Sequence, residues 1–509
     1  MYSVHIKHLF WSSLREVRIT FAKAQSFKFI ISQQAKNEVR LLLRFSGPAC
    51  ASTAWSVVLF LLAAITQKME KQLFIIALLL WSFMIHAQVT KAQLHVHTES
   101  ELYHKPVHIS ASNLSPGKKL KFGLDAVDAR GNEWHSKAYY IADGVGEIDL
   151  SRQPSVGGTY LGIYPMGLFW SLQCDDYHQI ATNAGFTATI TLSFEDQVLA
   201  QESIYRRSSR ELDALGIQGL QKRDSIIANY YLPQSDKKLP AIIFLGGSGG
   251  NFRAERASLF ASEGFAVLDL KYFRGEGLPD GIIEIPLEYV RKAHEWLKAQ
   301  PEIDPSKIGI TGRSRGSELA MLYATKYEVS YVISQVPSNV VWFGWADGKS
   351  SWTYQNEPFT YAEYTDEDSE RIELEMQAQG VQYHDGPKFL SAFKNETLIE
   401  ESAIAIEEIN CPVLFISGKD DKTWPSTMMA DRLVGRLVEN DFQFEFLHLA
   451  YEDAGHNFAG GGQGCGIPYL PAEDYSNSTA RGGTDKGNAL AAIDSWQQIL
   501  AFIHRHIKD

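Results

Sequence analysis

The chain has 509 residues, of which 45% are hydrophobic and 12% aromatic, and its formal net charge at pH 7 is −12. Because this length exceeds what one hydrophobic core organises, we expect two or three domains, and the hydrophobic content excludes a disordered chain. Residues 1–68 hold nine Lys/Arg and two Asp/Glu, a charge of +7, which leaves −19 on residues 69–509. So acidic a body argues against a nucleic-acid partner, because phosphate binding needs a basic face.

The N-terminal part contains two apolar runs, "ASTAWSVVLFLLAAI" from Ala51 and "LFIIALLLWSFMI" from Leu73. Each run is shorter than the ~20 residues that span a bilayer. From Met69 the sequence has the short polar start, the apolar centre and the small residue, Ala87, that are typical of a signal peptide. We therefore predict that Met69 is the true start, that residues 1–92 are an extension plus signal peptide, and that the protein is exported, periplasmic or secreted. The alternatives are a membrane anchor made by both runs and, if the signal interpretation is wrong, a cytoplasmic protein.

Four cysteines are present, Cys50, Cys174, Cys411 and Cys465, and their spacing matches no metal-ligand pattern. An oxidising compartment would permit one disulfide, but the sequence requires none. We therefore expect unpaired thiols, no bound metal and no cofactor.

Residues 93–206 alternate between apolar and polar positions in short runs that are separated by turn signals such as Ser-Pro-Gly and Arg-Gly-Asn. Runs such as "GFTATITLSF" are rich in β-branched residues, which favour strands. The pattern predicts an antiparallel β-sandwich of roughly 110 residues, a normal size for that architecture.

From residue 207 onward, predicted strands alternate with predicted helices. The strands are "LPAIIFLGG", "AVLDLKYF", "KIGITG", "VSYVISQVP" and "CPVLFISG", and the last helix is "NALAAIDSWQQILAFIHRHI". This alternation predicts a doubly wound, mostly parallel sheet in residues 207–509. About 70 residues separate the last two strands, which is too long for a plain connection, so residues 338–405 are predicted to form a cap over the sheet edge.

A short motif lies between the predicted strand at 307–312 and the helix that follows it. Gly312-Arg313-Ser314-Arg315-Gly316 fits G-x-S-x-G, in which the glycines let a sharp strand-to-helix turn pass close to its neighbours. Taken alone, the motif leaves Ser314 divided between capping a helix and acting as a nucleophile.

The acid and base that activate such a serine are expected after later strands. "CPVLFISGKDDKTWPS" offers Asp420 and Asp421, and "YEDAGHNF" offers His456. Asp421 is preferred because it has the G-x-x-D offset before a Pro-containing turn, and Asp420 is interpreted as a solvated or capping neighbour. The order Ser314, Asp421, His456 is that of an α/β hydrolase. We therefore predict that His456 takes the proton of Ser314 and that Asp421 orients the imidazole.

The glycine-rich loop "FLGGSGGNF" follows the first long strand of this part. Its backbone N–H groups could approach a developing oxyanion, where each donor contributes about 2.7–4 kcal/mol. The predicted donors are the amide of Arg315 together with that of Gly247 or Ser248. A phosphate-cradling loop is the rival interpretation, but no G-K-[ST] follows and G-x-G-x-x-G is not matched.

Two arginines, Arg313 and Arg315, flank Ser314. One interpretation is a positive field that binds an anionic substrate. The simpler interpretation, which we prefer here, is surface charge, with Arg315 paired to Glu318 three residues on.

Several longer stretches resemble the acyl-CoA thioesterases and bile acid-CoA:amino acid N-acyltransferases. They are "GGTYLGIYPMGLFWSLQ", "FLGGSGGNFRAERASLFASEGFAVLDLKYF", "SGKDDKTWPS" and "GGTDKGNALAAIDSWQQILAFIHRHI". The resemblance covers most of the chain from Gln93 onward and implies a Ser314–Asp421–His456 triad that cleaves an acyl thioester. The N-acyltransferases carry cysteine as nucleophile, so Ser314 favours water as the acceptor.

We therefore expect a serine hydrolase that cleaves acyl thioesters or esters through an acyl-enzyme intermediate, with a small-molecule substrate and no nucleic acid. Because acyl-CoA is a cytosolic metabolite, an exported protein could instead be a carboxylesterase for another ester. The further alternatives are an N-acyltransferase with the same triad and a non-catalytic extracytoplasmic binding protein.

Overall fold

The computed structural model describes residues 91–175, 180–195, 197–458, 467–471 and 481–507, together with the backbone of four strands before residue 45. The chain divides into two compact units, Met1–Thr90 and Lys91–Asp509. In the first unit the strands β1 (Tyr2–Lys7), β2 (Val17–Phe21), β3 (Gln25–Gln33) and β4 (Glu38–Arg44) form an antiparallel sheet in the order β1-β4-β3-β2. Both apolar runs, Met69 and the predicted signal peptide lie outside the described residues.

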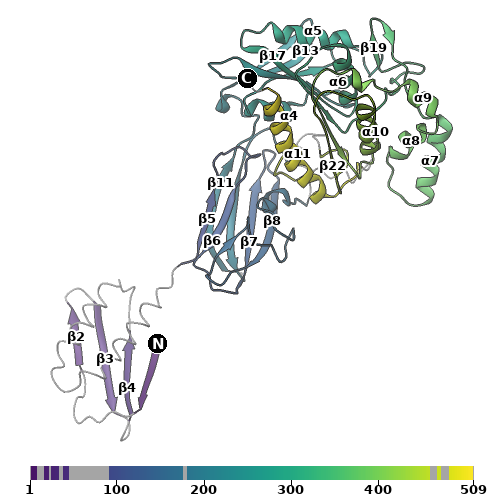
Figure 1. Cartoon of the computed structure of the whole chain (residues 1–509). Coiled ribbons are helices and arrows are strands. Elements are labelled where there is room, and N and C mark those ends of the chain that lie inside the picture. The colour runs from purple at the N-terminus through teal and green to yellow at the C-terminus, as the bar shows by residue number, and fades with distance from the viewer. Residues whose placement is uncertain are drawn as a thin grey trace. The chain divides into compact units, whose positions relative to one another are not determined.

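Two antiparallel sheets form the first part of the second unit (Figure 1). One sheet has the order β11-β10-β7-β8 and the other β5-β6-β9. The elements are β5 (Gln93–His97), β6 (His108–Ser112), β7 (Lys119–Val127), β8 (Glu133–Ile141), β9 (Ile148–Asp149), α3 (Gly167–Trp170), β10 (Phe186–Phe194) and β11 (Gln197–Arg206). The predicted antiparallel β-sandwich is confirmed.

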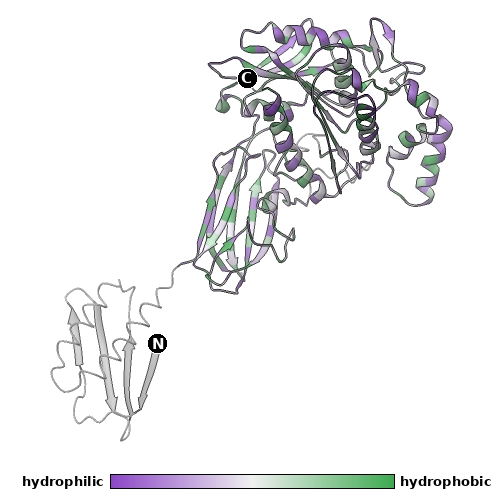
Figure 2. Cartoon of the chain, in the orientation of Figure 1, coloured by the Kyte–Doolittle hydropathy of each residue, from purple (hydrophilic) through white to green (hydrophobic). Residues whose placement is uncertain are grey.

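The core of the sandwich is formed by the apolar residues that alternate with polar ones along its strands. Buried and more exposed residues alternate along β7 and β8, and Figure 2 shows hydrophilic and hydrophobic residues mixed along the strands of the sandwich. Phe122 and Leu124 of β7 share one apolar core with Ile109 of β6, so the inner faces of the two sheets meet there. Each such buried side chain stabilises the fold by about 1.5–3 kcal/mol relative to an exposed one.

An eight-stranded sheet follows in the order β12-β13-β15-β14-β17-β18-β21-β22. Its strands are β12 (Ile217–Arg223), β13 (Ile227–Pro233), β14 (Leu239–Leu245), β15 (Ala266–Lys271), β17 (Ile303–Arg313), β18 (Val332–Gln335), β21 (Val413–Gly418) and β22 (Phe446–Tyr451). The pairs β12–β13 and β13–β15 are antiparallel, and all the other pairs are parallel. This is the strand arrangement of an α/β hydrolase, which confirms the predicted fold class.

Helices cover both faces of the large sheet. They are α4 (Ala254–Ser262), α5 (Leu287–Lys298), α6 (Arg315–Lys326), α10 (Ser426–Glu439) and α11 (Asp485–His506), and the short helix η1 (Asp213–Leu215) precedes the sheet. In β14, Ile242 and Phe244 belong to the core shared with α4 and α11, whereas Ile243 and Leu245 belong to the core shared with α5, α6 and α10. A strand buried on both faces explains why this run is continuously apolar.

The segment at 338–405, called the cap segment below, lies between β18 and β21. Most of its elements group beside α10 in Figure 1. The elements between β18 and β21 are β19 (Trp352–Tyr354), β20 (Glu357–Pro358), α7 (Asp366–Ala378), α8 (Gly386–Ala392), α9 (Glu396–Glu401) and η2 (Ile406–Glu408), and β19 also pairs with β16 (Ile285–Pro286). The domain boundary at residue 206 stays a prediction, because residues 91–509 form one compact unit.

Two smaller findings concern thiols and membranes. Cys174 and Cys411 are free thiols, and Cys465 and Cys50 lie outside the described side chains. Within the described part of the chain, no helix combines the length and the apolar character that crossing a bilayer requires.

Candidate active site

Ser314 occupies the sharp turn between β17 and α6. Its backbone has φ 56° and ψ −125°, and a positive φ at a non-glycine residue costs of order 1–3 kcal/mol. Sterics require the flanking glycines: a Cβ on Gly312 would lie 2.0 Å from the carbonyl oxygen of Gly316, and one on Gly316 would lie 2.2 Å from that of Gly246. The Ser314 side chain makes no capping hydrogen bond to α6, which removes the helix-cap interpretation.

The predicted acid and base are in contact. The Nδ1 atom of His456 lies 2.8 Å from Oδ2 and 3.0 Å from Oδ1 of Asp421, and their side chains are only 4% and 1% exposed. When Nδ1–H donates to this carboxylate, the Nε2 atom carries the free lone pair. Asp420 instead accepts a hydrogen bond from the backbone N–H of Gly483 at 2.7 Å, so it fastens a neighbouring loop.

Burial sets the protonation state of His456. It lowers the pKa of the imidazole to about 4, against the attraction of Asp421, which raises it, and the charge of Arg313 lowers it further. At neutral pH the imidazole is therefore uncharged, the form that a general base needs.

Arg313 holds the loop that carries His456. The side chain is buried, and its Nη2 atom donates at 2.7 Å to the carbonyl oxygen of His456 and at 2.7 Å to Oδ1 of Asn457. The same loop is held from α11, where Asn488 Oδ1 accepts from the N–H of Gly455 at 2.8 Å. Arg313, the last residue of β17 and the neighbour of Ser314, thus holds the backbone of His456, the predicted base.

Arg315 connects the start of the cap segment to the turn at Ser314. Its Nη2 atom donates to the carbonyl oxygens of Trp342 at 3.2 Å and Phe343 at 3.0 Å, and it also contacts the hydroxyl of Ser351. The predicted pair with Glu318 exists at 3.2 Å, but both side chains are buried. The interpretation of Arg313 and Arg315 as surface charges is therefore wrong, because both guanidinium groups bind interior carbonyls.

Glu318 completes this buried network. It accepts hydrogen bonds from the backbone N–H of Trp342 at 3.0 Å and from the indole N–H of Trp352 at 2.5 Å. Burial raises the pKa of Glu318 to about 7, and Arg315 opposes that rise. Removing either Arg315 or Glu318 would leave the other side chain as a buried charge without a counter-charge.

The cap segment is also fastened to the loop that carries Asp421. The carbonyl oxygen of Lys422 lies 3.1 Å from Nδ1 of His384 and accepts a hydrogen bond from the backbone N–H of Gly386 at 2.9 Å. Two parts of the cap segment are thus tied to the loops of Ser314 and Asp421 through backbone carbonyls.

The glycine-rich loop after β14 passes beside Ser314. A Cβ on Gly247 would lie 3.3 Å from Cβ of Ser314 and 3.1 Å from the carbonyl oxygen of Arg313. The loop is anchored at its end by Asp269, whose Oδ2 accepts the N–H of Arg253 at 2.7 Å. Gly247 is buried and Ser248 is exposed, and the assignment of their amides to an oxyanion hole stays a prediction.

An aromatic cluster leads from His456 into the cap segment. Trp424 contacts His456 with ring centroids 5.8 Å apart, Phe389 contacts Trp424 at 5.7 Å, and Trp342 contacts Phe389 at 4.7 Å, all edge to face. The sequence analysis did not identify this cluster, because its members lie far apart in the chain and no spacing links them.

Two family models match the chain. Residues 104–213 match the acyl-CoA thioester hydrolase/BAAT N-terminal region, and residues 285–509 match the BAAT/acyl-CoA thioester hydrolase C-terminal region. The two matches come in the same order as the sandwich and the large sheet. The chain belongs to the acyl-CoA thioester hydrolase/BAAT family.

The relatives of this chain carry two kinds of name, acyl-CoA thioesterase and N-acyltransferase. Mouse acyl-coenzyme A thioesterase 1 is 26% identical over 418 residues, covering 79% of this chain and 94% of the relative. Mouse acyl-coenzyme A amino acid N-acyltransferase 2 is 28% identical over 432 residues, covering 82% and 98%. Among solved structures, a putative dienelactone hydrolase from Klebsiella pneumoniae aligns with a TM-score of 0.34 and 16% identity, over 57% of this chain and 97% of that one.

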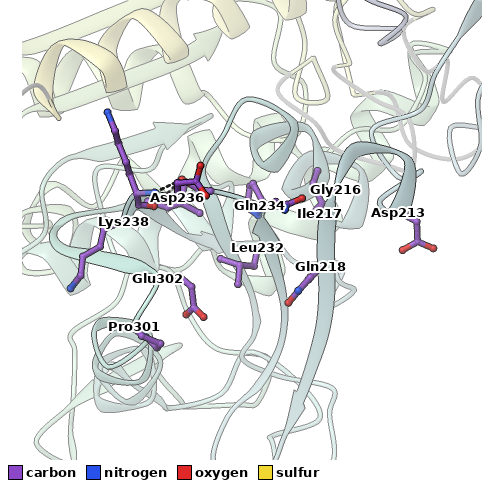
Figure 3. Close-up of a pocket in the computed structure, with 14 residues that line it drawn as sticks. Asp213, Gly216, Ile217, Gln218, Leu232, Gln234, Asp236, Lys238, Pro301 and Glu302 are labelled. Carbon is purple, nitrogen blue, oxygen red and sulfur yellow. Dashed lines mark hydrogen bonds between the residues drawn. The ribbon is translucent and has the colours of Figure 1, made fainter.

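A cavity near the start of the large sheet is remote from Ser314. It measures about 680 Å³ and is lined by residues such as Asp213, Lys238 and Glu302 (Figure 3). Leu239, the first residue of β14, lines it, whereas the glycine-rich loop follows the last residue of β14, roughly 20 Å further along the strand. This cavity therefore lies at the opposite end of the sheet from the candidate active site.

Proposed function

We propose that the protein hydrolyses acyl thioesters, with Ser314 as nucleophile, His456 as general base and Asp421 as the group that orients the imidazole. The family and the α/β-hydrolase fold support a thioester hydrolase or acyltransferase. The observation that most supports the finer proposal is the buried contact of 2.8 Å between His456 and Asp421 in a domain where Ser314 occupies a strained turn.

In the proposed reaction, Ser314 Oγ attacks the thioester carbonyl while its proton passes to Nε2 of His456. The oxyanion accepts hydrogen bonds from the amides of Arg315 and of Gly247 or Ser248. The carbon–sulfur bond then breaks, the thiolate takes the proton from His456, and the acyl group stays on Ser314. Water attacks this ester with the help of His456, which releases the carboxylic acid and restores the serine.

The aromatic cluster supports an apolar acyl group. Trp342, Phe389 and Trp424 belong to one apolar core with Val340 and Met429, next to the imidazole that acts in both steps. Trp342 and Trp424 are 0% and 1% exposed, so an acyl chain would contact this cluster at the partly buried ring of Phe389.

The test compares wild type with Ser314→Ala, using an active-serine phosphonate probe and a panel of acyl esters and acyl-CoA thioesters. We expect labelling and turnover in wild type only. Equal labelling of the two proteins would refute Ser314 as nucleophile. A wild type that is inert toward the probe and the whole panel would favour a non-catalytic binding protein.

Acyl transfer is the second candidate, because two mouse relatives are named N-acyltransferases at 28% identity. The assay adds glycine or taurine to the thioester reaction and measures amide products by mass spectrometry. We expect free acid as the dominant product, because the resemblance pairs amino-acid conjugation with a cysteine nucleophile. Amide in excess of acid would assign the protein to the acyltransferases.

We also propose export by a signal peptide that starts at Met69, on the strength of its polar start and apolar centre. N-terminal sequencing of the protein from fractionated cells tests this, and a mature N-terminus near Ala87 outside the cytoplasm is expected. An intact N-terminus in the cytoplasmic fraction would refute export and remove the objection to acyl-CoA as substrate.

A further inference from the structure

Two buried polar side chains hold the glycine-rich loop, which runs from Gly246 to Arg253. Asp269 belongs to β15, and Tyr272 follows the last residue of that strand. The Oδ2 atom of Asp269 accepts the backbone N–H of Arg253 at 2.7 Å, and the hydroxyl of Tyr272 donates to the carbonyl oxygen of Gly246 at 2.5 Å. The two residues are 1% and 2% exposed, so water does not compete for these hydrogen bonds. We call Asp269 and Tyr272 the loop clamp, because they hold the loop at its two ends.

The pairing of the strands explains why both side chains reach the loop. β14 and β15 are parallel, and their last paired residues are Leu245 and Leu270. Parallel neighbours end at the same edge of a sheet, so the residues that follow β15 lie beside the loop that follows β14. Arg253 lies at the N-terminus of α4, where the helix dipole also favours a carboxylate acceptor.

Tyr272 acts on the peptide group that carries one of the predicted oxyanion donors. The carbonyl of Gly246 and the N–H of Gly247 belong to the same peptide group, which is planar and trans, so the two point in opposite directions. A hydrogen bond that fixes the carbonyl therefore also fixes the direction of the N–H. Gly247 is buried, and within the part of the chain that the structure describes its N–H makes no hydrogen bond, which leaves it available to an oxyanion.

The same peptide group lies against the turn at Ser314. A Cβ on Gly316, the second residue of α6, would lie 2.2 Å from the carbonyl oxygen of Gly246, and a Cβ on Gly247 would lie 3.3 Å from that of Ser314. A rotation of this peptide group would therefore change the distance between its N–H and a carbonyl that Ser314 attacks. Displacements of about 1 Å at such a site cost roughly 10² in rate.

Asp269 is kept in the interior at a cost in stability. Burial raises the pKa of its carboxyl group to about 7; the N–H and the charge of Arg253 and the charge of Arg223 oppose this rise, and the charge of Glu255 adds to it. Buried groups with a strongly shifted pKa are concentrated at functional sites. This cost favours a role in function for Asp269.

We infer that Asp269 and Tyr272 are positioning residues for the oxyanion hole, and that the donor in the glycine-rich loop is the N–H of Gly247. This inference rests on the proposed function and deepens it. The loop clamp acts through the backbone of the loop, above all through the peptide group between Gly246 and Gly247. Because the oxyanion forms only as the reaction proceeds, we expect the loop clamp to affect kcat and not KM.

Steady-state kinetics of Tyr272→Phe with octanoyl-pantetheine test the hydrogen bond to Gly246. Without this bond, kcat should fall about tenfold while KM changes less than twofold. The control is Tyr230→Phe, which removes a buried hydroxyl on β13 that has no hydrogen-bond partner among the described residues. The control should keep the wild-type kcat. An equal loss in both variants, or a rise in KM alone, would overturn the inference.

Two substitutions at Asp269 test the other end of the loop. Asp269→Leu removes the acceptor of the Arg253 N–H and should lower kcat about tenfold at constant KM. Asp269→Asn keeps an oxygen that can accept the same N–H and should recover most of the loss. Urea unfolding checks that each variant folds. If Asp269→Leu does not fold, the comparison of Tyr272→Phe with Tyr230→Phe decides the inference.

Hydrogen–deuterium exchange separates this inference from the proposed function, because it needs no turnover. Tyr272→Phe should speed amide exchange in residues 246–253 about tenfold, and Tyr230→Phe should not. Unchanged exchange together with unchanged kcat in Tyr272→Phe would overturn the inference and leave Ser314 as the proposed nucleophile. If the wild type is inert toward every substrate, the proposed function fails, and the exchange rates alone decide whether the loop clamp holds the loop.

Discussion

Two sets of a serine, a histidine and an aspartate lie at the large sheet and differ in their surroundings: the proposed catalytic set of Ser314, His456 and Asp421, and a second set at β21, β22 and α10. In the second group, Ser417 Oγ lies 2.7 Å from Nε2 of His448, and Nδ1 of His448 lies 3.0 Å from Oδ1 of Asp431. By its hydrogen bonds, this group at β21, β22 and α10 has the complete connectivity of a triad.

The surroundings of the two serines differ. Ser417 is fully buried within β21, and its hydroxyl also bonds to that of Thr427 at 2.9 Å. Ser314 lies at a strained turn beside Gly247. The two aspartates also differ in burial. The side chain of Asp431 is 67% exposed, whereas that of Asp421 is 1% exposed. Nucleophilic catalysis needs a turn that presents the hydroxyl and donors for the oxyanion, and only the surroundings of Ser314 provide the turn.

The largest effect should distinguish the two serines. Ser314→Ala should lower kcat by roughly 10⁴–10⁶, because the oxyanion donors and substrate binding alone leave only a small residual rate. Ser417→Ala should change kcat less than twofold and lower stability by about 1–3 kcal/mol, because the hydroxyl loses its two hydrogen bonds, to His448 and Thr427. Steady-state kinetics and urea unfolding of both variants measure this, and a large loss of kcat in Ser417→Ala would break the comparison.

The two acids offer the next contrast. Asp421→Asn should lower kcat by about 10⁴, because an amide no longer selects the correct imidazole tautomer. Asp431→Asn, at an exposed position, should retain wild-type kcat. Circular dichroism of both variants checks that they fold, and equal losses in the two would mean that the His448 group also takes part in the reaction.

Arg313 tests whether positioning from β17 matters. Arg313→Gln should lower kcat by roughly 10²-fold with a small change in KM, because the loop of His456 loses two hydrogen bonds and a shift of about 1 Å has this cost. Arg313→Lys should recover part of the loss. A variant that unfolds, or one that raises KM alone, would contradict a positioning role.

The smallest predicted effect concerns the pH dependence of kcat/KM. His456 must be uncharged to accept the serine proton, and burial lowers its pKa to about 4. Activity is therefore fully present above this pKa and is lost as the pH falls through it. With an acyl-pantetheine substrate, kcat/KM at pH 5 should stay near its value at pH 7. An imidazole with the ordinary pKa of about 6.5 would lose roughly 30-fold at pH 5, which is the result that would contradict the burial effect.

The sequence predicted the elements whose signal is local. The apolar run of β14, the glycines around Ser314 and the order of serine, acid and base all follow from chain-local chemistry, and the structure brings His456 and Asp421 into contact. The environment of Arg313 and Arg315 could not be predicted in this way. Apart from the predicted contact of Arg315 with Glu318, their partners include the backbone carbonyls of His456, Trp342 and Phe343, and a carbonyl has no signature in a sequence.

The second Ser–His–Asp group was missed for a related reason. Ser417 and His448 lie within apolar strands, where a single polar residue gives no sign of its partner on the neighbouring strand. Only the parallel pairing of β21 with β22, and the packing of α10 on them, bring Ser417, His448 and Asp431 together.

The hydrogen bonds that join the cap segment to the loops of Ser314 and Asp421 are accepted by the carbonyl oxygens of Trp342, Phe343 and Lys422. Every amino acid supplies a carbonyl, so mutations that exchange these three side chains leave the acceptors in place. Side chains at these three positions can therefore change without removing the acceptors that hold the cap segment to the loops of Ser314 and Asp421.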